Sequence, residues 1–257
     1  MSNPVSPLEL VSQYRAEVTT RVDALAAVAQ SHAFDAAVDL MVAAIQNGGV
    51  IQAFGTGHSE AFAMEIAGRA GGLIPTNKIA LRDVVLHGSR NIDSLTGSSL
   101  ERDPGVVEEL FEISPVGPED VFIIASNSGV NGSVVGLALL AKSRGHKVVA
   151  VTSLEHTRLV EPKHPSGRRL YEVADVVLDN LAPFGDSTLR VIGDIPVGAV
   201  SSITAAFIAQ LLTIETVRRM ADSGQTPPLY ISANIPGGDE HNRALERLYQ
   251  GKIRRSA

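Results

Sequence analysis

The sequence of 257 residues contains no cysteine and no tryptophan, and aromatic residues make up only 4% of it. The absence of cysteine excludes disulfide bonds, thiolate metal ligands and a cysteine nucleophile. No run of 18 apolar residues occurs, which argues against a membrane-spanning helix. The first ten residues lack a basic start followed by an apolar stretch, so no secretory signal is expected. These absences are typical of a cytoplasmic protein, and we predict that location.

The charge balance is acidic and gives no indication of a nucleic-acid partner. Lys and Arg number 22 against 28 Asp and Glu, which gives a formal net charge of −6 at pH 7. The basic residues are scattered, so no nucleic-acid surface is predicted, and no membrane partner is expected either. An acidic protein that binds an anion must do so through a local site rather than through its overall field.

Two segments each combine a buried strand, a small polar loop and a helix. Residues 50–54 (VIQAF) precede the loop GTGHS at 55–59, and residues 121–124 (VFII) precede the loop SNSGVNG at 126–132. Short apolar runs bounded by Gly and Ser are typical of buried strands. A strand that passes through such a loop into a helix presents backbone N–H groups and a helix dipole to an anion. The geometry favours a phosphate ligand, although a tight turn alone would explain either loop taken singly.

The two loops together resemble those of the sugar isomerase (SIS) domain family of phosphosugar-binding proteins. That family has a GxGxS loop after its first strand and an SxSGxT-like loop after a later one, which match GTGHS (55–59) and SNSGVN (126–131). The resemblance covers residues 46–217, and Asn131 stands where the family usually has Thr. It implies a phosphorylated sugar ligand, with an amino sugar preferred, and no cofactor. The implied ligand-binding residues are Gly57, His58, Ser59, Ser126, Asn127, Ser128, Gly129, Asn131 and Ser201.

Strands alternate with helices along the chain, which predicts a three-layer α/β sandwich with a mostly parallel sheet. Further elements are expected as an extended region at 73–86, strands at 147–152 and 175–178, a long helix at 197–220 and a short strand at 229–231. In such folds ligands bind at the carboxyl ends of the strands, where the Gly- and Ser-rich loops fall. Residues 1–47 are expected to form N-terminal helices and residues 48–257 the SIS domain. The resemblance implies that these helices contact a partner subunit, in a homodimer or tetramer with the site near the interface.

Five residues are candidates for acid–base catalysis: Glu60, Glu65, His87, Glu240 and His241. Glu60 and Glu65 are the carboxylates nearest the first loop, and His87 follows a predicted strand end. Glu240 and His241 belong to the segment GGDEHN (237–242), which resembles the ending of one branch of SIS proteins. Each has a structural alternative, because a carboxylate in a first helical turn complements the helix dipole and a loop histidine is often a surface residue.

A gap-free match to phosphoheptose isomerases places their catalytic glutamate at Arg69 of this chain, so that base cannot be transferred. Arg69 is expected to bind a ligand oxygen or to form an ion pair instead. No HExxH-type spacing is present, so no metal is predicted. Residues 58–60 (HSE) and 239–241 (DEH) would form a metal site only if the fold brought them together.

The chemistry implied by the resemblance begins with removal of the C2 proton of a sugar phosphate by a carboxylate or imidazole. Return of the proton to C1 gives aldose–ketose isomerisation, whereas departure of a C3 substituent gives elimination, as in the SIS etherases that act on N-acetylmuramate phosphate. Three hypotheses remain open. The chain is a lyase (dehydratase or etherase) acting on an amino-sugar 6-phosphate such as N-acetylglucosamine 6-phosphate, a sugar phosphate isomerase, or a non-catalytic phosphosugar sensor.

Overall fold

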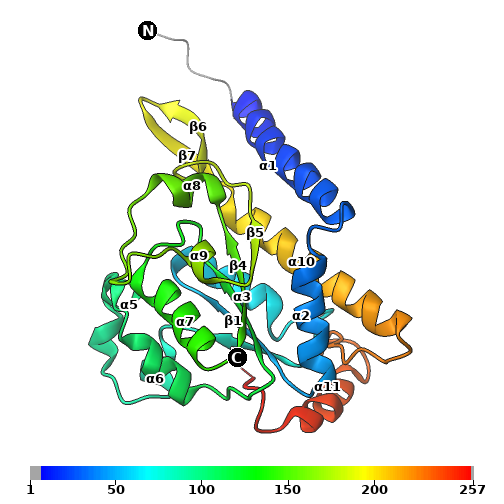
Figure 1. Cartoon of the computed structure of the whole chain (residues 1–257). Helices are drawn as coiled ribbons and strands as arrows, with labels where there is room; N and C mark the ends of the chain where they lie inside the picture. Colours follow the sequence, from blue (N-terminus) through cyan, green and yellow to red (C-terminus); the bar gives the residue numbers. More distant parts are fainter. Residues whose placement is uncertain (1–6, 256–257) are drawn as a thin grey trace.

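The computed structural model describes residues 7–255, which form a parallel sheet covered by helices on both faces (Figure 1). The sheet has five strands in the order β2-β1-β3-β4-β5, and every neighbouring pair is parallel. The predicted three-layer α/β sandwich is therefore confirmed. The strands are β1 (Ile51–Gly55), β2 (Thr76–Ile79), β3 (Val121–Ala125), β4 (Lys147–Thr152) and β5 (Val176–Asp179).

The central strands β1 and β3 are buried along their whole length. Strands that are covered on both faces are continuously apolar rather than alternating, which is why VFII at 121–124 forms the middle of the sheet. Two hydrophobic clusters fill the spaces on either side of it. One face is covered by α2 (Asp35–Gln46), α3 (Glu60–Ile66) and α10 (Ser201–Asp222), and the other by α6 (Val106–Ile113), α7 (Gly132–Ser143) and α9 (Leu170–Val173).

The chain leaves the neighbouring strands β1 and β3 toward opposite faces of the sheet. β1 continues into α3 on one face and then to β2, whereas β3 continues into α7 on the other face and then to β4. The two strands pair in register, so that Gly55 lies opposite Ala125 where both strands end. Such a switch point opens a crevice between the two departing loops, and open α/β sheets bind their ligands there.

Smaller elements surround this frame. The helix α1 (Pro7–Gln30) lies beside a hairpin of β6 (Ser187–Ile192) and β7 (Ile195–Ala199) at the top of Figure 1, where the Tyr14 hydroxyl donates to the Ala199 carbonyl at 2.6 Å. The remaining helices are α4 (Asp83–Leu86), α5 (Ser99–Arg102), α8 (Leu154–Leu159) and α11 (Gly238–Glu246), with short 3₁₀ turns η1 (Gly57–Ser59), η2 (Ile92–Leu95) and η3 (Arg247–Tyr249). Within the described residues no single helix is both long and apolar enough to cross a membrane; α1 and α2 pass that test only as a pair, bent by 68°.

Three predicted elements differ in the structure. The long helix begins at Ser201 rather than at residue 197, because residues 195–199 form β7 of a hairpin that the sequence did not indicate. Only Thr76–Ile79 of the extended region is a strand, since the Asp83 carboxylate accepts the Ala80 N–H at 3.0 Å and turns the chain into α4. The segment 229–231 makes a single antiparallel bridge, from Leu229 to Leu73, rather than a strand.

The carboxyl-terminal residues are bound to the side chain of Asn77 on β2. The Asn77 side chain donates to the Lys252 carbonyl at 2.7 Å and accepts the Arg254 N–H, also at 2.7 Å. The Lys252 ammonium group in turn donates to the Gly48 carbonyl at 2.8 Å. The tail is thereby bound both to β2, through Asn77, and to the chain just before β1, through Gly48.

A buried carboxylate connects the amino ends of the two central strands. Asp120 is only 4% exposed, and its side chain accepts the N–H groups of Val50 at 2.8 Å and Gly117 at 2.9 Å. It also accepts the Gln52 side-chain amide at 2.7 Å. One carboxylate therefore satisfies three donors at the starts of the two central strands.

We predict that Asp120→Ala lowers the free energy of unfolding by about 3 kcal/mol or more, because each buried donor left unpaired costs roughly 1–3 kcal/mol. Urea denaturation of the purified variant measures this. The matched control is Asp194→Ala, since Asp194 is an exposed hairpin residue paired with Arg190 at 3.6 Å, and such pairs contribute about 0–1 kcal/mol. Equal stability of the two variants would contradict the prediction.

Candidate functional site

A narrow crevice lies at the carboxyl ends of the strands, between the loops that leave β1 and β3. It is lined by side chains from both loops, from the ends of β4 and β5 and from the first turns of α3 and α10. Among residues 7–255, His58 is the only lining residue with an ionisable side chain. The lining residues are His58, Ser59, Phe62, Ala125, Ser126, Asn127, Val151, Asn180, Ser201, Ser202 and Ala205.

The loop after β1 depends on its glycines. A Cβ at Gly55 would lie 2.2 Å from the Ser59 carbonyl oxygen, so only glycine permits the chain to fold back this closely. Gly57 has φ +55°, which glycine adopts without strain. Among residues 7–255 the hydroxyl of Ser59 has no hydrogen-bond partner, so it is available to a ligand in the crevice.

The loop after β3 leaves a second set of polar groups available. The Ser126 hydroxyl oxygen accepts the Gly129 N–H at 3.1 Å, which leaves its own hydrogen free to donate. The Asn127 side-chain oxygen accepts from the Asn180 amide at 3.1 Å, so its nitrogen remains for a ligand. Gly129 has φ +62° and packs closely, because a Cβ there would lie 3.0 Å from the Thr152 hydroxyl.

The start of α10 is held at the crevice by Asp186. Its carboxylate accepts the Val200 N–H at 3.1 Å, the Ser201 N–H at 2.7 Å and the Ser201 hydroxyl at 2.7 Å. A carboxylate at the beginning of a helix complements the helix dipole. Because the hydroxyl hydrogen of Ser201 is committed to Asp186, this serine can accept a hydrogen bond from a ligand rather than donate one.

A glutamate from α5 joins the two loops on the other side of the crevice. One oxygen of Glu101, Oε1, accepts both the Thr56 hydroxyl at 3.1 Å and the Asn131 side-chain amide at 2.6 Å. Asn131, a predicted ligand residue, is therefore bound to Glu101 and does not line the crevice, and neither does Ser128. Nothing in the sequence singled out Glu101, which lies in a polar segment without a recognisable motif.

Three of the predicted catalytic side chains lie near the first loop but outside the crevice. Glu60 forms ion pairs with Arg82 at 2.9 Å and with Lys78 at 3.5 Å. Glu65 accepts the Gln210 amide at 2.8 Å and forms an ion pair with Arg69, as expected for that arginine. His87 is exposed at the end of α4. None of the three lines the crevice.

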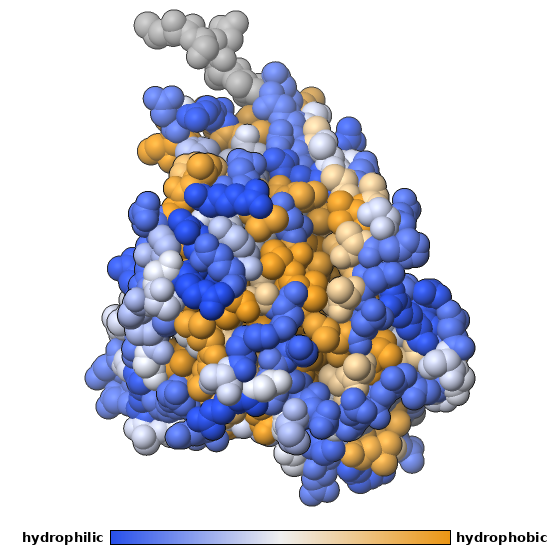
Figure 2. Space-filling view, viewed as in Figure 1, coloured by the Kyte–Doolittle hydropathy of each residue, from blue (hydrophilic) through white to orange (hydrophobic). Residues whose placement is uncertain are grey.

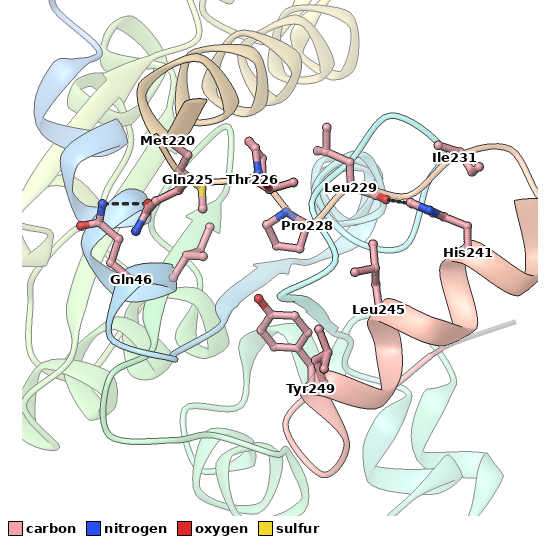
Figure 3. A pocket seen from close by; sticks show the side chains of 13 residues that line it. Gln46, Met220, Gln225, Thr226, Pro228, Leu229, Ile231, His241, Leu245 and Tyr249 are labelled. Atoms are coloured by element: carbon pink, nitrogen blue, oxygen red, sulfur yellow. Dashed lines mark hydrogen bonds between the residues drawn. The ribbon is translucent and has the colours of Figure 1, made fainter. Parts of the chain in front are cut away.

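Glu240 and His241 lie on α11, at the end of the sheet opposite to the crevice. His241 faces a groove of about 630 Å³ formed with the ends of α2 and α10, and its Nε2 lies 3.0 Å from the Leu229 carbonyl (Figure 3). Within one chain His241 is therefore remote from the crevice. It could reach only the crevice of a neighbouring subunit. Residues 58–60 and 239–241 are equally far apart in the fold, and no cluster of three metal-ligating side chains occurs within residues 7–255.

The structure gives the GGDEHN segment a role in fastening the C-terminal helix. The Asn242 side chain accepts the Ile231 N–H at 3.0 Å and donates to the Ile231 carbonyl at 2.8 Å, as a neighbouring strand would. A Cβ at Gly238 would lie 2.0 Å from the Ser232 carbonyl oxygen, so glycine is required for this approach. Of the polar side chains of the segment, those of His241 and Asn242 are thus bound to the chain at residues 229–231, whereas Asp239 forms an ion pair with Arg243 at 2.7 Å.

The larger groove is the less suitable site for an anion. Its walls are mainly apolar, and the amides of Gln46 and Gln225 are paired with each other at 3.0 Å (Figure 3). The crevice is narrower, but it gathers hydroxyl and amide groups whose hydrogen-bonding capacity is unused. Chemistry rather than volume therefore identifies the crevice as the candidate site.

Comparisons with known proteins identify the family of this chain. A SIS domain model matches residues 13–153. A UPF0309 protein of Listeria monocytogenes is 40% identical over 225 residues, covering 87% of this chain and 91% of that protein, and one of Geobacillus kaustophilus is 37% identical over 218 residues, covering 84% and 85%. A phosphoheptose isomerase of Francisella tularensis has a similar fold, with a TM-score of 0.51 and 16% identity over 82% of this chain and 100% of that one. One of Neisseria gonorrhoeae has a TM-score of 0.50 and 20% identity over 84% and 100%.

His156 supports the loop that carries Asp186. Its Nδ1 accepts the Gly185 N–H at 2.9 Å, and its ring stacks on Phe184 with 5.1 Å between centroids. Burial lowers the pKa of His156 below its usual value of 6.5, and the nearby carboxylates of Asp186 and Glu155 oppose this only in part. The neutral imidazole is therefore the form that the folded protein favours.

We predict that His156 makes the folded state less stable as the pH falls. Between the lowered pKa and 6.5 the unfolded chain binds more protons than the folded one, so stability is fully present above pH 6.5 and is lost toward the lower pKa. Urea denaturation at pH 8 and pH 5.5 should show a smaller loss for His156→Gln than for the unchanged protein. The paired comparison is needed because burial also lowers the pKa of His164, which titrates in both proteins. Equal losses would refute the role of His156.

Proposed function

This chain belongs to the SIS domain family and to the UPF0309 proteins within it, and from that premise we propose that it is a phosphosugar-binding enzyme acting at C2 of an amino-sugar 6-phosphate. The proposed reaction is an elimination of the dehydratase or etherase type, with N-acetylglucosamine 6-phosphate as an example of the substrate class. The supporting observation is the convergence of Ser59, Ser126 and Asn127 in one crevice at the switch point of the sheet.

The phosphate would be held by neutral donors. The free hydroxyl hydrogens of Ser59 and Ser126 and the side-chain nitrogen of Asn127 point to an acceptor-rich group, and a phosphate offers several oxygens. Within the part of the chain that the structure describes, no Lys or Arg lines the crevice. Binding would therefore depend on hydrogen-bond geometry at the loop ends rather than on a cationic clamp.

The sugar would extend from the phosphate past His58, with C1 and C2 beside the loops that border the crevice. His58 is the ionisable side chain there, and an imidazole can carry a proton to or from the O1 oxygen near neutral pH. The preference for elimination on an amino sugar rests on the likeness of the two loops to those of SIS etherases. The presence of Arg69 at the position of the isomerase glutamate supports the same preference.

Isomerisation of a sugar phosphate is the second candidate, because both reactions begin with the same removal of the C2 proton. It is supported by the shared fold with phosphoheptose isomerases. A phosphosugar sensor without catalysis is the third candidate, and it predicts binding without any exchange of the C2 proton.

We predict that the purified protein exchanges the C2 proton of one of several phosphosugars in D₂O, as followed by proton NMR. The mixture would contain glucosamine 6-phosphate, N-acetylglucosamine 6-phosphate, N-acetylmuramate 6-phosphate and hexose phosphates. A product that has lost water or lactate identifies a lyase, and a ketose identifies an isomerase. Unchanged spectra together with a thermal shift on ligand addition would replace the enzyme by the sensor.

Two serine variants test whether the crevice is the place of binding. Ser126→Ala should weaken phosphosugar binding by about tenfold, since a hydrogen bond to a charged group contributes roughly 1.5–3 kcal/mol. Ser143→Ala is the control, because the Ser143 hydroxyl lies at the far end of α7 and donates to the Leu140 carbonyl. Equal weakening by both changes would place the ligand elsewhere.

We also propose that two copies of the chain associate through α1 and the hairpin. Figure 2 shows apolar surface in the middle of the face drawn and at the hairpin. Ile192 and Ile195 at the hairpin end are 80% and 76% exposed, and Leu8 on α1 is 82% exposed. Apolar side chains exposed in one region commonly mark a protein interface.

Light scattering should give a mass of twice the 27.1 kDa of one chain or more, because burial of the exposed hairpin would stabilise the assembly. Changing both Ile192 and Ile195 to Asp should return the mass to 27.1 kDa with unchanged far-UV circular dichroism. A monomeric unchanged protein would disprove the association.

A further inference from the structure

We infer that Glu101 is the base that removes the C2 proton in the reaction proposed above, on which this assignment rests. Glu101 does not line the narrow crevice; it lies beside it, where its side chain joins Thr56 of the first loop to Asn131 of the second. A sugar that extends from a phosphate in the crevice across these two loops would therefore have the carboxylate of Glu101 beside it.

The position of Glu101 is built into the packing of α5 on α7. A Cβ at Gly132 would lie 2.2 Å from the Arg102 carbonyl oxygen, so the absence of a side chain at this first residue of α7 permits the contact. The Ser133 hydroxyl donates to the Glu101 carbonyl at 2.8 Å, and Leu100 is buried in the hydrophobic cluster below. The backbone that carries Glu101 is thus docked on α7 on either side of this residue.

The two oxygens of the Glu101 carboxylate have different surroundings. Oε1 is anchored by the Thr56 hydroxyl and the Asn131 amide, one from each loop of the crevice. Oε2 makes no hydrogen bond within residues 7–255, and it lies 4.0 Å from the place where a side chain at Gly57 would begin. Since Gly57 is exposed and immediately precedes His58, Oε2 is directed to the first loop with a lone pair available.

The other carboxylates around the crevice are already engaged. Glu60 and Glu65 form ion pairs with arginines, and Asp186 accepts three hydrogen bonds at the start of α10. Glu101 combines an anchored oxygen, which fixes its direction, with a free oxygen that can accept a proton.

The proton transfer balances with groups of the chain. The C2–H bond breaks and its proton goes to Oε2, while its electron pair forms a C1–C2 double bond and the carbonyl pair moves to O1. Protonated His58 supplies the proton that O1 then takes. In elimination the O1 proton returns to His58, the O1–H electron pair re-forms the C1 carbonyl, and the C1–C2 pair moves to form a C2–C3 double bond. The C3 substituent departs with the C3–O electron pair, and its oxygen takes the proton from Glu101. In isomerisation Glu101 gives its proton to C1, the O2–H bond of the enediol breaks, its electron pair forms the C2 carbonyl, and its proton goes to His58.

The decisive variant is Glu101→Gln, because the amide oxygen can still accept from Thr56 and Asn131. We expect C2 exchange in D₂O to slow by a factor of about 10²–10⁴, the usual contribution of general base catalysis, while the phosphosugar dissociation constant changes less than about threefold. Glu112→Gln is the matched control, since Glu112 is an exposed carboxylate on α6. Thermal unfolding of both variants verifies that the fold is retained.

The outcomes separate this assignment from the proposed function. Exchange by the unchanged protein, lost in Glu101→Gln with binding retained, supports Glu101 as the base. Exchange that persists in Glu101→Gln overturns the assignment and leaves the proposed function standing. Binding and exchange lost together would also overturn it, because a strut between the two loops would behave in that way. If the unchanged protein does not exchange the C2 proton, the proposed enzymatic function is wrong, and the assignment of Glu101 as the base is wrong as well.

Discussion

The in-register pairing of β1 with β3 is the constraint on which the site depends. These strands end side by side at Gly55 and Ala125, and the chain leaves them toward opposite faces of the sheet. No side chain has to be placed individually for a crevice to form there, because the topology opens it. The glycines that follow each strand then decide how closely the two loops approach, and the helices α3, α7 and α10 supply the walls.

The protein is acidic and its proposed ligand is an anion, and the composition of the crevice indicates how the two are compatible. Among the described residues no carboxylate, Lys or Arg lines the crevice. Glu101 accepts hydrogen bonds from both loops, and Asp186 accepts them from the start of α10. Phosphate oxygens can therefore be met by hydroxyl and amide groups without a cation. A site of this kind selects a ligand by the directions of its hydrogen bonds more than by its charge. Such selection suits the proposed ligand, which must present C2 to one side.

Sequence patterns predicted the parts of this molecule that depend on local signals. Buried runs such as 121–124 and the glycine and serine loops predicted the strands, the sheet type and the position of the two polar loops, because period and loop chemistry are local properties. The hairpin at 187–199 was missed, since its strands carry mixed side chains and Pro196 and lie outside the main sheet, beside α1. Glu101 was missed for a different reason: its importance lies in two contacts from residues 45 positions before it and 30 positions after it. The two polar loops of the candidate site therefore follow from local sequence signals, whereas the position of Glu101 depends on tertiary contacts.

The tail bound to Asn77 has a consequence for the solvation of β2. Asn77 is only 2% exposed, and both ends of its side-chain amide are bound to the backbone of the tail, at Lys252 and Arg254. Displacement of the tail would leave this buried amide without these partners, which costs free energy. One side chain of the outermost strand thereby makes residues 252–254 part of the solvent-excluded structure.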